Sequence, residues 1–234
     1  MNTRTSASTN PRALKDAVYA QLARIGKASS NPTRLELLDL LGQSPRTVED
    51  LASLTSQRLA NVSQHLQVLR AARLVDAERS GLHVTYRLAD DRVSVFLAAL
   101  RAVAEARLVE MEQVARTFLD DRKELEGVDR DALIKRMKKG EVTVLDVRPV
   151  EEYRAGHVPG AVSMPLADLK RGLANLTKAR DVVAYCRGPY CVFAFEAVKM
   201  LRARGFNAIR LDEGIPEWKA RGLRVELSPR EVTS

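Results

Sequence analysis

The sequence predicts two domains: a mainly helical domain that ends in a β-hairpin, followed by an α/β domain with a mostly parallel sheet. The chain has 234 residues, more than the roughly 100–200 residues of a usual single domain. Short helical patterns and then two strands around a Ser-Gly turn fill the first half. In the second half strands alternate with helices, which is the pattern of a parallel sheet.

The composition sets broad limits on compartment and partners. The net charge is +8 and the pI is about 9.7, which by itself favours a polyanionic partner only weakly. No apolar run approaches the ~20 residues that cross a bilayer, and the polar segment 1–10 lacks the apolar core of a secretory signal. We therefore expect a flexible tail over 1–10, a cytoplasmic protein and no membrane partner.

The first half contains start signals for three short helices. Asn31 and Pro32 suit a helix N-cap and first turn, and Gly42 suits the end of that helix. The segment 47–50 (Thr-Val-Glu-Asp) resembles a capping box for a second helix. Ser56 is the expected cap of the third. The apolar face of the third helix is expected to comprise Leu59, Val62, Leu66 and Leu69.

The third helix and the hairpin that follows carry polar and basic groups suited to DNA. Three short helices in this order are typical of a helix-turn-helix, whose last helix enters the major groove, where Asn and Gln pair with adenine and Arg with guanine. The strands 74–79 and 82–88 form a wing, on which Arg79 and Arg87 are placed to contact phosphates. The opposite, polar face of the third helix offers Arg58, Asn61, Gln64 and His65.

The stretch 31–88 resembles the ArsR/SmtB family of bacterial repressors, through Asn-Pro-Thr-Arg-Leu at 31–35, Val-Ser-Gln-His-Leu-Gln-Val-Leu at 62–69 and the hairpin through Tyr-Arg-Leu at 86–88. The resemblance implies a homodimeric winged helix that leaves its operator when a ligand binds. It also implies that Ser63, Gln64 and His65 lie on the recognition helix.

Apolar residues at helical spacing over 11–27 and 91–119 fit the dimer that the resemblance implies, although they would also suit a cover for their own domain. Metal-binding members of the family use Cys in the first helix of the helix-turn-helix, or Asp and His in the last helix. Residues 47–54 contain no Cys, and residues 91–119 contain neither Cys nor His. No metal and no cofactor are therefore predicted for this half.

The charged segment 120–127 predicts a linker between a first domain over 11–119 and a second over 128–226, with a short tail over 227–234. In the second domain, apolar stretches predict buried strands and helical spacing predicts two helices, the second stopped by Gly205. The expected strands cover 142–148, 181–185 and 208–211, and the expected helices cover 131–139 and 191–204.

The only two cysteines of the chain lie close together, at the end of one of these strands. Two cysteines are too few for a disulfide-stapled secreted fold, and a close pair in a cytosolic protein is more often chemical than structural. Cys186 begins a tight loop that opens a helix, where backbone N–H groups favour an anion such as a thiolate or a persulfide. Arg187 adds positive charge, and Gly188 permits the turn.

Residues 127–226 resemble a single rhodanese domain, through Leu-Asp-Val-Arg at 145–148, Gly-His-Val-Pro-Gly-Ala at 156–161, Tyr-Cys-Arg-Gly at 185–188 and Leu-Asp-Glu-Gly-Ile-Pro-Glu-Trp at 211–218. The resemblance implies that Cys186 is the sulfur-accepting nucleophile, with Arg187 beside it. The loop residues are Gly188, Pro189 and Tyr190, and supporting roles fall to Asp146, Arg148 and His157.

One position departs from the rhodanese pattern. Rhodaneses often place a basic residue five positions after the nucleophile, and this chain has Cys191 there. The usual clamp for thiosulfate is missing and Arg187 would replace it only in part, which argues against efficient thiosulfate sulfurtransferase activity but leaves a rhodanese-type sulfurtransferase open. The residue six after Cys186 is Val192, which argues against the Cys-x5-Arg chemistry of related phosphatases. Cys191 is interpreted either as a resolving thiol that attacks a persulfide on Cys186 or as a small apolar residue at a helix start.

Three functions remain open at this stage. The leading hypothesis is a repressor that responds to polysulfide, persulfide or thiosulfate through Cys186 and changes its affinity for operator DNA. The second is a sulfurtransferase whose DNA-binding half regulates its own operon. The third is a sensor of arsenite or another thiophilic metal that uses Cys186 and Cys191, although two thiolates alone make a weak site.

Overall fold

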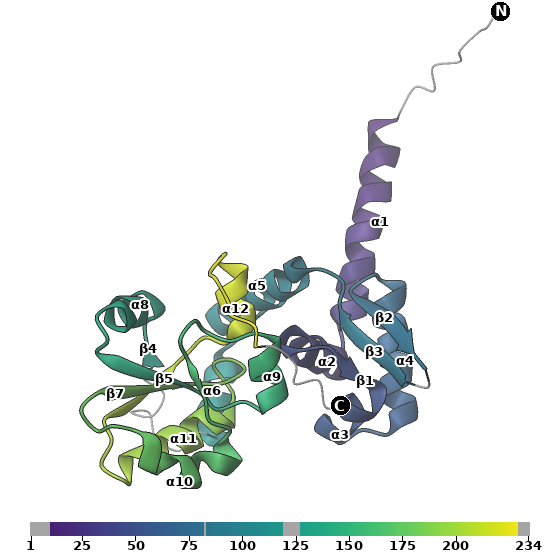
Figure 1. The fold of residues 1–234 in the computed structure, drawn as a ribbon. Helices are drawn as coiled ribbons and strands as arrows, with labels where there is room; N and C mark the ends of the chain where they lie inside the picture. The colour runs from purple at the N-terminus through teal and green to yellow at the C-terminus, as the bar shows by residue number, and fades with distance from the viewer. Residues whose placement is uncertain (1–9, 82, 119–126, 229–234) are drawn as a thin grey trace, which may run out of the picture. The chain divides into compact units, whose positions relative to one another are not determined.

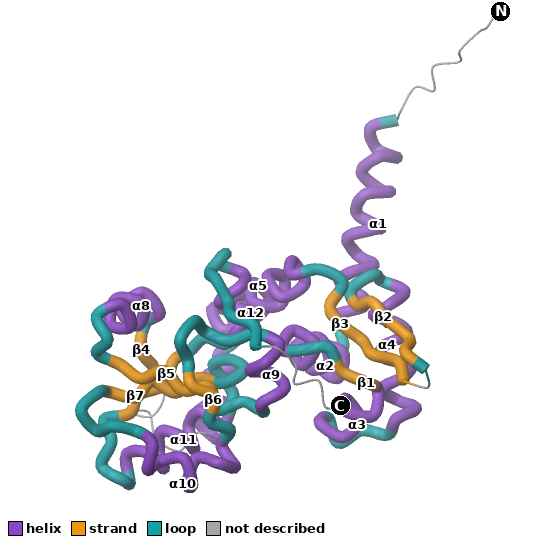
Figure 2. The backbone as a smooth tube through the Cα atoms, viewed as in Figure 1, coloured by secondary structure: helices purple, strands orange, loops and turns teal. Residues whose placement is uncertain are grey.

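The computed structural model describes residues 10–81, 83–118 and 127–228. Within these limits the chain forms two compact units, one built from residues 10–38 and 46–89 and the other from residues 39–45 and 90–228 (Figures 1 and 2). Residues 1–9 of the expected tail over 1–10, residues 120–126 of the expected linker over 120–127 and residues 229–234 of the expected tail over 227–234 lie outside the described part of the chain. Gly127, expected in the linker, forms part of β4 (Gly127–Val128).

The first unit is a winged helix-turn-helix, as predicted. Its small antiparallel sheet has the strand order β1-β3-β2, and β2 and β3 form the wing. Side chains of α2, α3 and α4 fill the core, with Leu37, Leu51 and Leu66 fully buried. The elements are α1 (Pro11–Ser29), α2 (Pro32–Gln43), β1 (Arg46–Thr47), α3 (Val48–Leu54), α4 (Leu59–Ala71), β2 (Val75–Ser80) and β3 (His83–Leu88).

Two of the three predicted helix starts are confirmed. The Asn31 side chain accepts a hydrogen bond from the Arg34 amide. Thr47 and Asp50 form a reciprocal capping box at the start of α3. The prediction for Ser56 was wrong: α4 begins at Leu59 with Arg58 at the N-cap position and no side-chain cap.

Smaller differences in this unit have local causes. Ser56 has φ +52°, so it forms part of the turn before α4 instead of capping it. Leu59, placed on the apolar face by its spacing, is the first residue of α4 and is half exposed. The first predicted helix continues through Gly42 to Gln43. Strand β1 was not predicted, because two residues carry no periodicity.

The second unit is an α/β domain with a fully parallel five-stranded sheet of order β4-β8-β7-β5-β6. This confirms the predicted architecture. Its elements are α5 (Asp91–Arg107), α6 (Val109–Phe118), β4 (Gly127–Val128), α8 (Arg130–Lys138), β5 (Val142–Asp146), α9 (Val150–Ala155), β6 (Val162–Ser163), α10 (Leu169–Gly172), β7 (Asp181–Tyr185), α11 (Val192–Arg202), β8 (Ala208–Leu211) and α12 (Ile215–Ala220).

Two apolar layers sandwich this sheet. One contains side chains of α10 and α11, including Leu169 and Val198, packed on strand residues. The other contains side chains of α8 and α12, including Leu133 and Trp218. The strands are therefore buried on both faces, which explains why their sequences are almost continuously apolar. Among the described residues, no helix is both long enough and apolar enough to cross a membrane.

One continuous helix was predicted over residues 91–119, but the structure has two helices there. The helix breaks at Leu108, whose backbone is extended (φ −110°, ψ 106°), and continues as α6. Helix α5 packs against α12, so α5 and α6 belong to the second compact unit. The sequence had grouped them with the first domain.

Candidate functional site

Strand β7 delivers Cys186 directly into the loop that precedes α11. Cys186 is only 1% exposed and packs in the apolar layer beneath α11. Cys191 is partly buried at the N-cap position of α11. The two residues form a disulfide with a Cα–Cα distance of 6.1 Å, within the limit of about 7 Å for such a bond. Across the described residues, no cluster of three or more His, Cys, Asp or Glu side chains could hold a metal ion.

Hydrogen bonds within the loop and from strand β8 hold the loop in place. The Cys191 amide donates to the Gly188 carbonyl over 3.2 Å, closing the turn. Arg210, on β8, donates to the Pro189 carbonyl over 3.0 Å. The guanidinium of Arg210 is buried and lies 4.2 Å from the ring centroid of Phe195. Sequence reasoning missed Arg210 because an arginine in a short strand gives no local sign of its partner.

Arg187, the expected positive neighbour of Cys186, is ion-paired. Its Nη2 lies 2.7 Å from a carboxylate oxygen of Glu152, which is fully buried, and its Nε lies 3.1 Å from both oxygens. The guanidinium also lies 5.9 Å from the Phe193 ring centroid. Glu152 therefore neutralises the positive charge of Arg187, which was expected to stabilise an anion at Cys186.

Asp146 and Arg148, predicted as supporting residues, form a buried ion pair beside the end of β7. Both are fully buried, and Arg148 Nε donates to Asp146 over 2.9 Å. Arg148 also donates to the Gly156 carbonyl over 2.7 Å. The Tyr185 hydroxyl donates to Asp146, and burial together with this carboxylate raises the pKa of Tyr185 well above its ordinary value. Removing one partner of such a buried pair costs about 3–5 kcal/mol.

His157, the third predicted supporting residue, is 4% exposed. Its Nδ1 lies 2.8 Å from the Tyr153 carbonyl, and its ring stacks on the Tyr153 ring at 3.7 Å. Its backbone pairs with Glu226. These contacts hold the chain next to α9, as expected for a residue that supports the fold.

Gln43, the last residue of α2, connects that helix to the cysteine loop. Its side chain is 3% exposed. The amide oxygen accepts from Arg148 Nη1 over 3.1 Å, and the amide nitrogen donates to the Arg187 carbonyl over 3.2 Å. Gly214 packs against the same carbonyl so closely that a Cβ would clash with it. Sequence reasoning missed Gln43, since a glutamine at a helix end carries no local signal.

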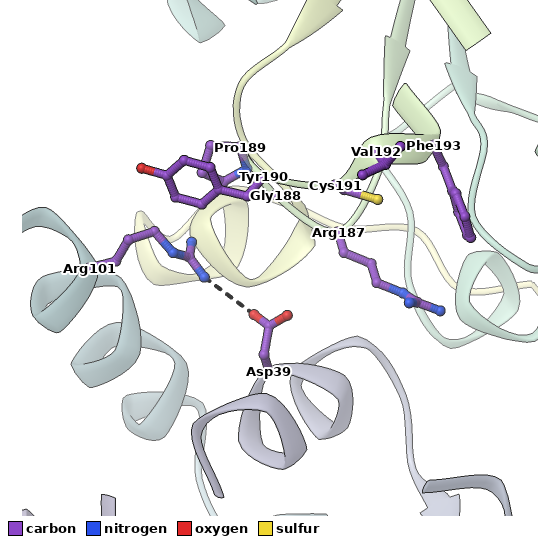
Figure 3. Close-up of a pocket in the computed structure, with 9 residues that line it drawn as sticks. All are labelled: Asp39, Arg101, Arg187, Gly188, Pro189, Tyr190, Cys191, Val192 and Phe193. Atoms are coloured by element: carbon purple, nitrogen blue, oxygen red, sulfur yellow. Dashed lines mark hydrogen bonds and ion pairs between the residues drawn. The ribbon is translucent and has the colours of Figure 1, made fainter. Parts of the chain in front are cut away.

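A pocket of about 360 Å³ lies against the loop. Its walls are Asp39, Arg101 and residues 187–193 (Figure 3). In Figure 3 the Arg101 guanidinium reaches toward Asp39, with an Nη2–Oδ1 distance of 3.3 Å. Arg101 also forms an ion pair with Glu217, so the charge of this arginine is shared between two carboxylates.

Two groups of the pocket have shifted pKa values. Desolvation raises the pKa of Asp39 to about 6, helped by the carboxylates of Glu217 and Glu152 and opposed by Arg101 and Arg187. Desolvation and a 2.8 Å hydrogen bond to Glu105 raise the pKa of Tyr190 to about 12.

The residues predicted to contact DNA lie on α4 and the wing. Asn61 and Gln64 are exposed on α4, whereas Ser63 and His65 are half-buried. Arg58 is exposed at the N-cap position. Both wing arginines are exposed: Arg79 donates to the Gly81 carbonyl over 3.2 Å, and Arg87 lies 2.9 Å from the Asp76 carboxylate.

Comparison with known proteins identifies both parts of the chain. Residues 31–77 match the model of the arsR family of bacterial regulatory proteins, and residues 129–221 match that of rhodanese-like domains. An HTH-type transcriptional regulator of Mycobacterium tuberculosis is 44% identical over 212 residues, which cover 91% of this chain and 93% of the relative. The chain belongs to the ArsR family. It is a transcriptional regulator of the ArsR/SmtB type with a C-terminal rhodanese domain.

Other proteins are similar to parts of this ArsR-family regulator. A sulfurtransferase of Allochromatium vinosum is 29% identical over 100 residues, covering 42% of the regulator and 92% of the sulfurtransferase. The homodimeric winged helix-turn-helix DNA-binding domain of a possible ArsR-family regulator from Mycobacterium bovis is 39% identical. It covers 44% of the regulator and 94% of that chain, with a TM-score of 0.41.

Proposed function

We propose that this ArsR-family regulator is a homodimeric repressor that responds to reactive sulfur through Cys186 and Cys191. The observation that carries the proposal is the pair of hydrogen bonds made by Gln43, which tie α2 to the first peptide of the cysteine loop. Helix α2 also supplies Leu37 and Leu38 to the core of the winged helix. A change in the loop therefore reaches a helix on which the DNA-binding fold is built.

The sulfur chemistry uses both cysteines in the reduced protein. The Cys186 thiolate attacks the sulfane sulfur of a small persulfide, R–S–SH, and releases the thiolate RS⁻. The Cys191 thiolate then attacks the Sγ of Cys186 and releases hydrosulfide, HS⁻, which leaves a Cys186–Cys191 disulfide. The proximity of the two cysteines, with a Cα–Cα distance of 6.1 Å, supports this second step. Closed and open loops are the two discrete states that a switch requires.

The DNA-binding surface in this proposal is the exposed face of α4 with the wing. Basic groups at the wing contact phosphates, and amide side chains on α4 contact base edges in the major groove. The exposure of Asn61, Gln64, Arg79 and Arg87 supports this arrangement. The proposed contact residues are Arg58, Asn61, Ser63, Gln64, His65, Arg79 and Arg87.

The dimer in this proposal pairs through α1. This helix exposes four large apolar side chains, each about half exposed or more, at helical spacing: Leu14, Val18, Tyr19 and Leu22. Contiguous exposed apolar surface of this kind marks a protein interface.

A gel shift of the full-length protein on its operator, with and without polysulfide, tests the proposal. Polysulfide is expected to release wild-type protein from DNA and to leave Cys186→Ser bound. Cys191→Ser is expected to gain sulfur without forming the intramolecular bridge. If Cys186→Ser responds to polysulfide like the wild type, the proposed sensor role is wrong.

A sulfurtransferase function is the second candidate, supported by the position of Cys186 at the end of a parallel strand and by the similarity to a sulfurtransferase. Repeated turnover separates the two: an enzyme transfers many sulfur atoms per protein to an acceptor such as cyanide, whereas a sensor reacts once. The ion pair of Arg187 with Glu152 leads us to expect little turnover with thiosulfate.

A further inference from the structure

The two sulfurs of the disulfide differ in their surroundings. Cys186 is 1% exposed and lies in the apolar layer beneath α11, whereas Cys191 is partly exposed and forms part of the pocket wall. We infer that this pocket binds a small persulfide of low net charge and directs it to Cys191, with Cys186 as the leaving thiolate. The inference rests on the proposed function and adds an activity to it: the disulfide form also takes up sulfur.

The charges around the pocket select the donor. Arg101 is paired with Glu217 and Asp39, and Arg187 is paired with Glu152. Each arginine of the wall is thus neutralised before a ligand arrives, so a dianion such as thiosulfate gains no uncompensated positive charge. The mixed wall, with one carboxylate, two guanidinium groups and two aromatic rings, suits the persulfide of a zwitterionic amino thiol. The volume of about 360 Å³ lies at the small end of typical ligand pockets.

The reaction at Cys191 needs no external oxidant. The persulfide anion R–S–S⁻ attacks the Sγ of Cys191, the Cys186–Cys191 bond breaks, and its electron pair leaves on Cys186 as the thiolate. The product at Cys191 is R–S–S–Sγ. The Cys186 thiolate then attacks the sulfur bonded to Cys191 and expels RS⁻. The net result is a trisulfide bridge between the two cysteines and one thiolate RS⁻, so one sulfur atom is inserted.

Peptide mapping tests which sulfur is attacked. Oxidised full-length protein is treated with cysteine, which forms a mixed disulfide, and is then trapped with iodoacetamide. Cleavage by trypsin after Arg187 separates the two cysteines, because Cys186 lies in peptide 181–187 and Cys191 in peptide 188–199. We expect the alkyl group on Cys186 and the cysteine adduct on Cys191. The reverse distribution, or an equal mixture, would overturn the assignment.

A matched pair of variants tests the pocket. Val192 lines it and is 48% exposed, whereas Val162 on β6 is 43% exposed and is not part of its wall. With cysteine hydropersulfide as the probe, Val192→Trp should slow trisulfide formation about tenfold or more, since a displaced donor loses its alignment with the disulfide. Val162→Trp should react like the wild type. Equal rates for the three proteins would contradict the pocket assignment.

Intact-mass measurement completes the test. Oxidised wild-type protein should gain the mass of one sulfur atom from cysteine hydropersulfide and none from thiosulfate at equal concentration. Uptake from thiosulfate at the same rate would refute the proposed donor class. This result is independent of the gel shift: a regulator that is released from DNA by polysulfide but is attacked at Cys186 keeps the proposed function and loses this inference.

Discussion

Among single residues, Asp39 has an unusual electrostatic environment. It faces Arg101 and Arg187, but also the carboxylates of Glu217 and Glu152, and desolvation raises its pKa from 3.8 to about 6. Because the pKa is higher in the folded state, the native protein holds this proton more tightly than the unfolded chain. The resulting stability is fully present below pH 4 and is lost as the pH rises through about 6.

Asp39→Asn should therefore change the pH profile of stability. The wild type is expected to lose stability relative to the variant between pH 4 and about 6.5, and the difference should stay constant above that. Thermal denaturation across this range gives the comparison, and an NMR titration of the Asp39 carboxyl gives its midpoint directly. A midpoint near 4 would contradict the environment described for this carboxyl.

The exposed residues of α4 and the wing should fall into two classes. Gln64→Ala is expected to cost about 1–3 kcal/mol on the operator and to relax base preference at one position, because a base contact is lost. Arg79→Ala is expected to weaken binding to all sequences alike and to reduce the salt slope by about one, because a phosphate contact is lost. Fluorescence anisotropy over a salt series, with operator and random duplexes, measures both. Identical behaviour of the two variants would contradict these roles.

At the level of elements, α2 is the helix through which the cysteine loop is proposed to act. Gln43→Leu keeps a side chain of similar size but removes the hydrogen bonds to Arg148 Nη1 and the Arg187 carbonyl. We expect a loss of about 1–3 kcal/mol in stability, the cost of unpaired buried groups. We also expect DNA binding that no longer responds to polysulfide.

Formation of the Cys186–Cys191 disulfide when reduced Gln43→Leu is treated with polysulfide, measured by intact mass, should match the wild type, which separates coupling from chemistry. Gln113→Leu on α6, an exposed position, is the matched control and should respond normally. A Gln43→Leu protein that still leaves its operator on sulfur loading would show that α2 does not carry the signal.

Elements whose bounds are set by neighbouring residues were predicted well, and features that depend on distant contacts were not. The capping box at 47–50 and the strands 181–185 and 208–211 were predicted within their observed bounds, because caps and apolar runs are read from neighbouring residues. The break at Leu108 was missed, and so was the packing of α5 against α12, a contact that is remote in sequence.

The same holds for the candidate site. The motif around Cys186 predicted a loop at the end of a strand, and the structure has it there. The partners of that loop, Gln43 on α2 and Arg210 on β8, are 144 and 21 residues from their acceptors. Hydrogen bonds over such separations leave no trace in residue spacing. The carboxylate that pairs with Arg187 was equally out of reach of sequence reasoning.

For the whole molecule, the proposed dimer predicts a defined effect of charge on α1. Leu22 is 60% exposed, and Leu22→Glu should shift the protein from dimer toward monomer, because a carboxylate would be buried in the interface without a partner. Operator affinity should fall with it, since the two half-sites are no longer bound together. Sedimentation velocity reports the oligomeric state. Gln21→Glu, one residue earlier, is the control. If the two variants sediment equally, α1 is not the dimer interface.

Gln43 and Arg148 are separated by more than a hundred positions, yet exchanging either one alone removes a hydrogen-bond partner of the other. A chimera that kept α2 but received a foreign rhodanese sequence would bury the Gln43 amide beside a carbonyl and a guanidinium of different placement. A rhodanese segment excised at residue 128 would lose Gln43 and also α5, the helix that covers α12. A cut in the gap between the two sequence motifs therefore removes residues that belong to the second compact unit.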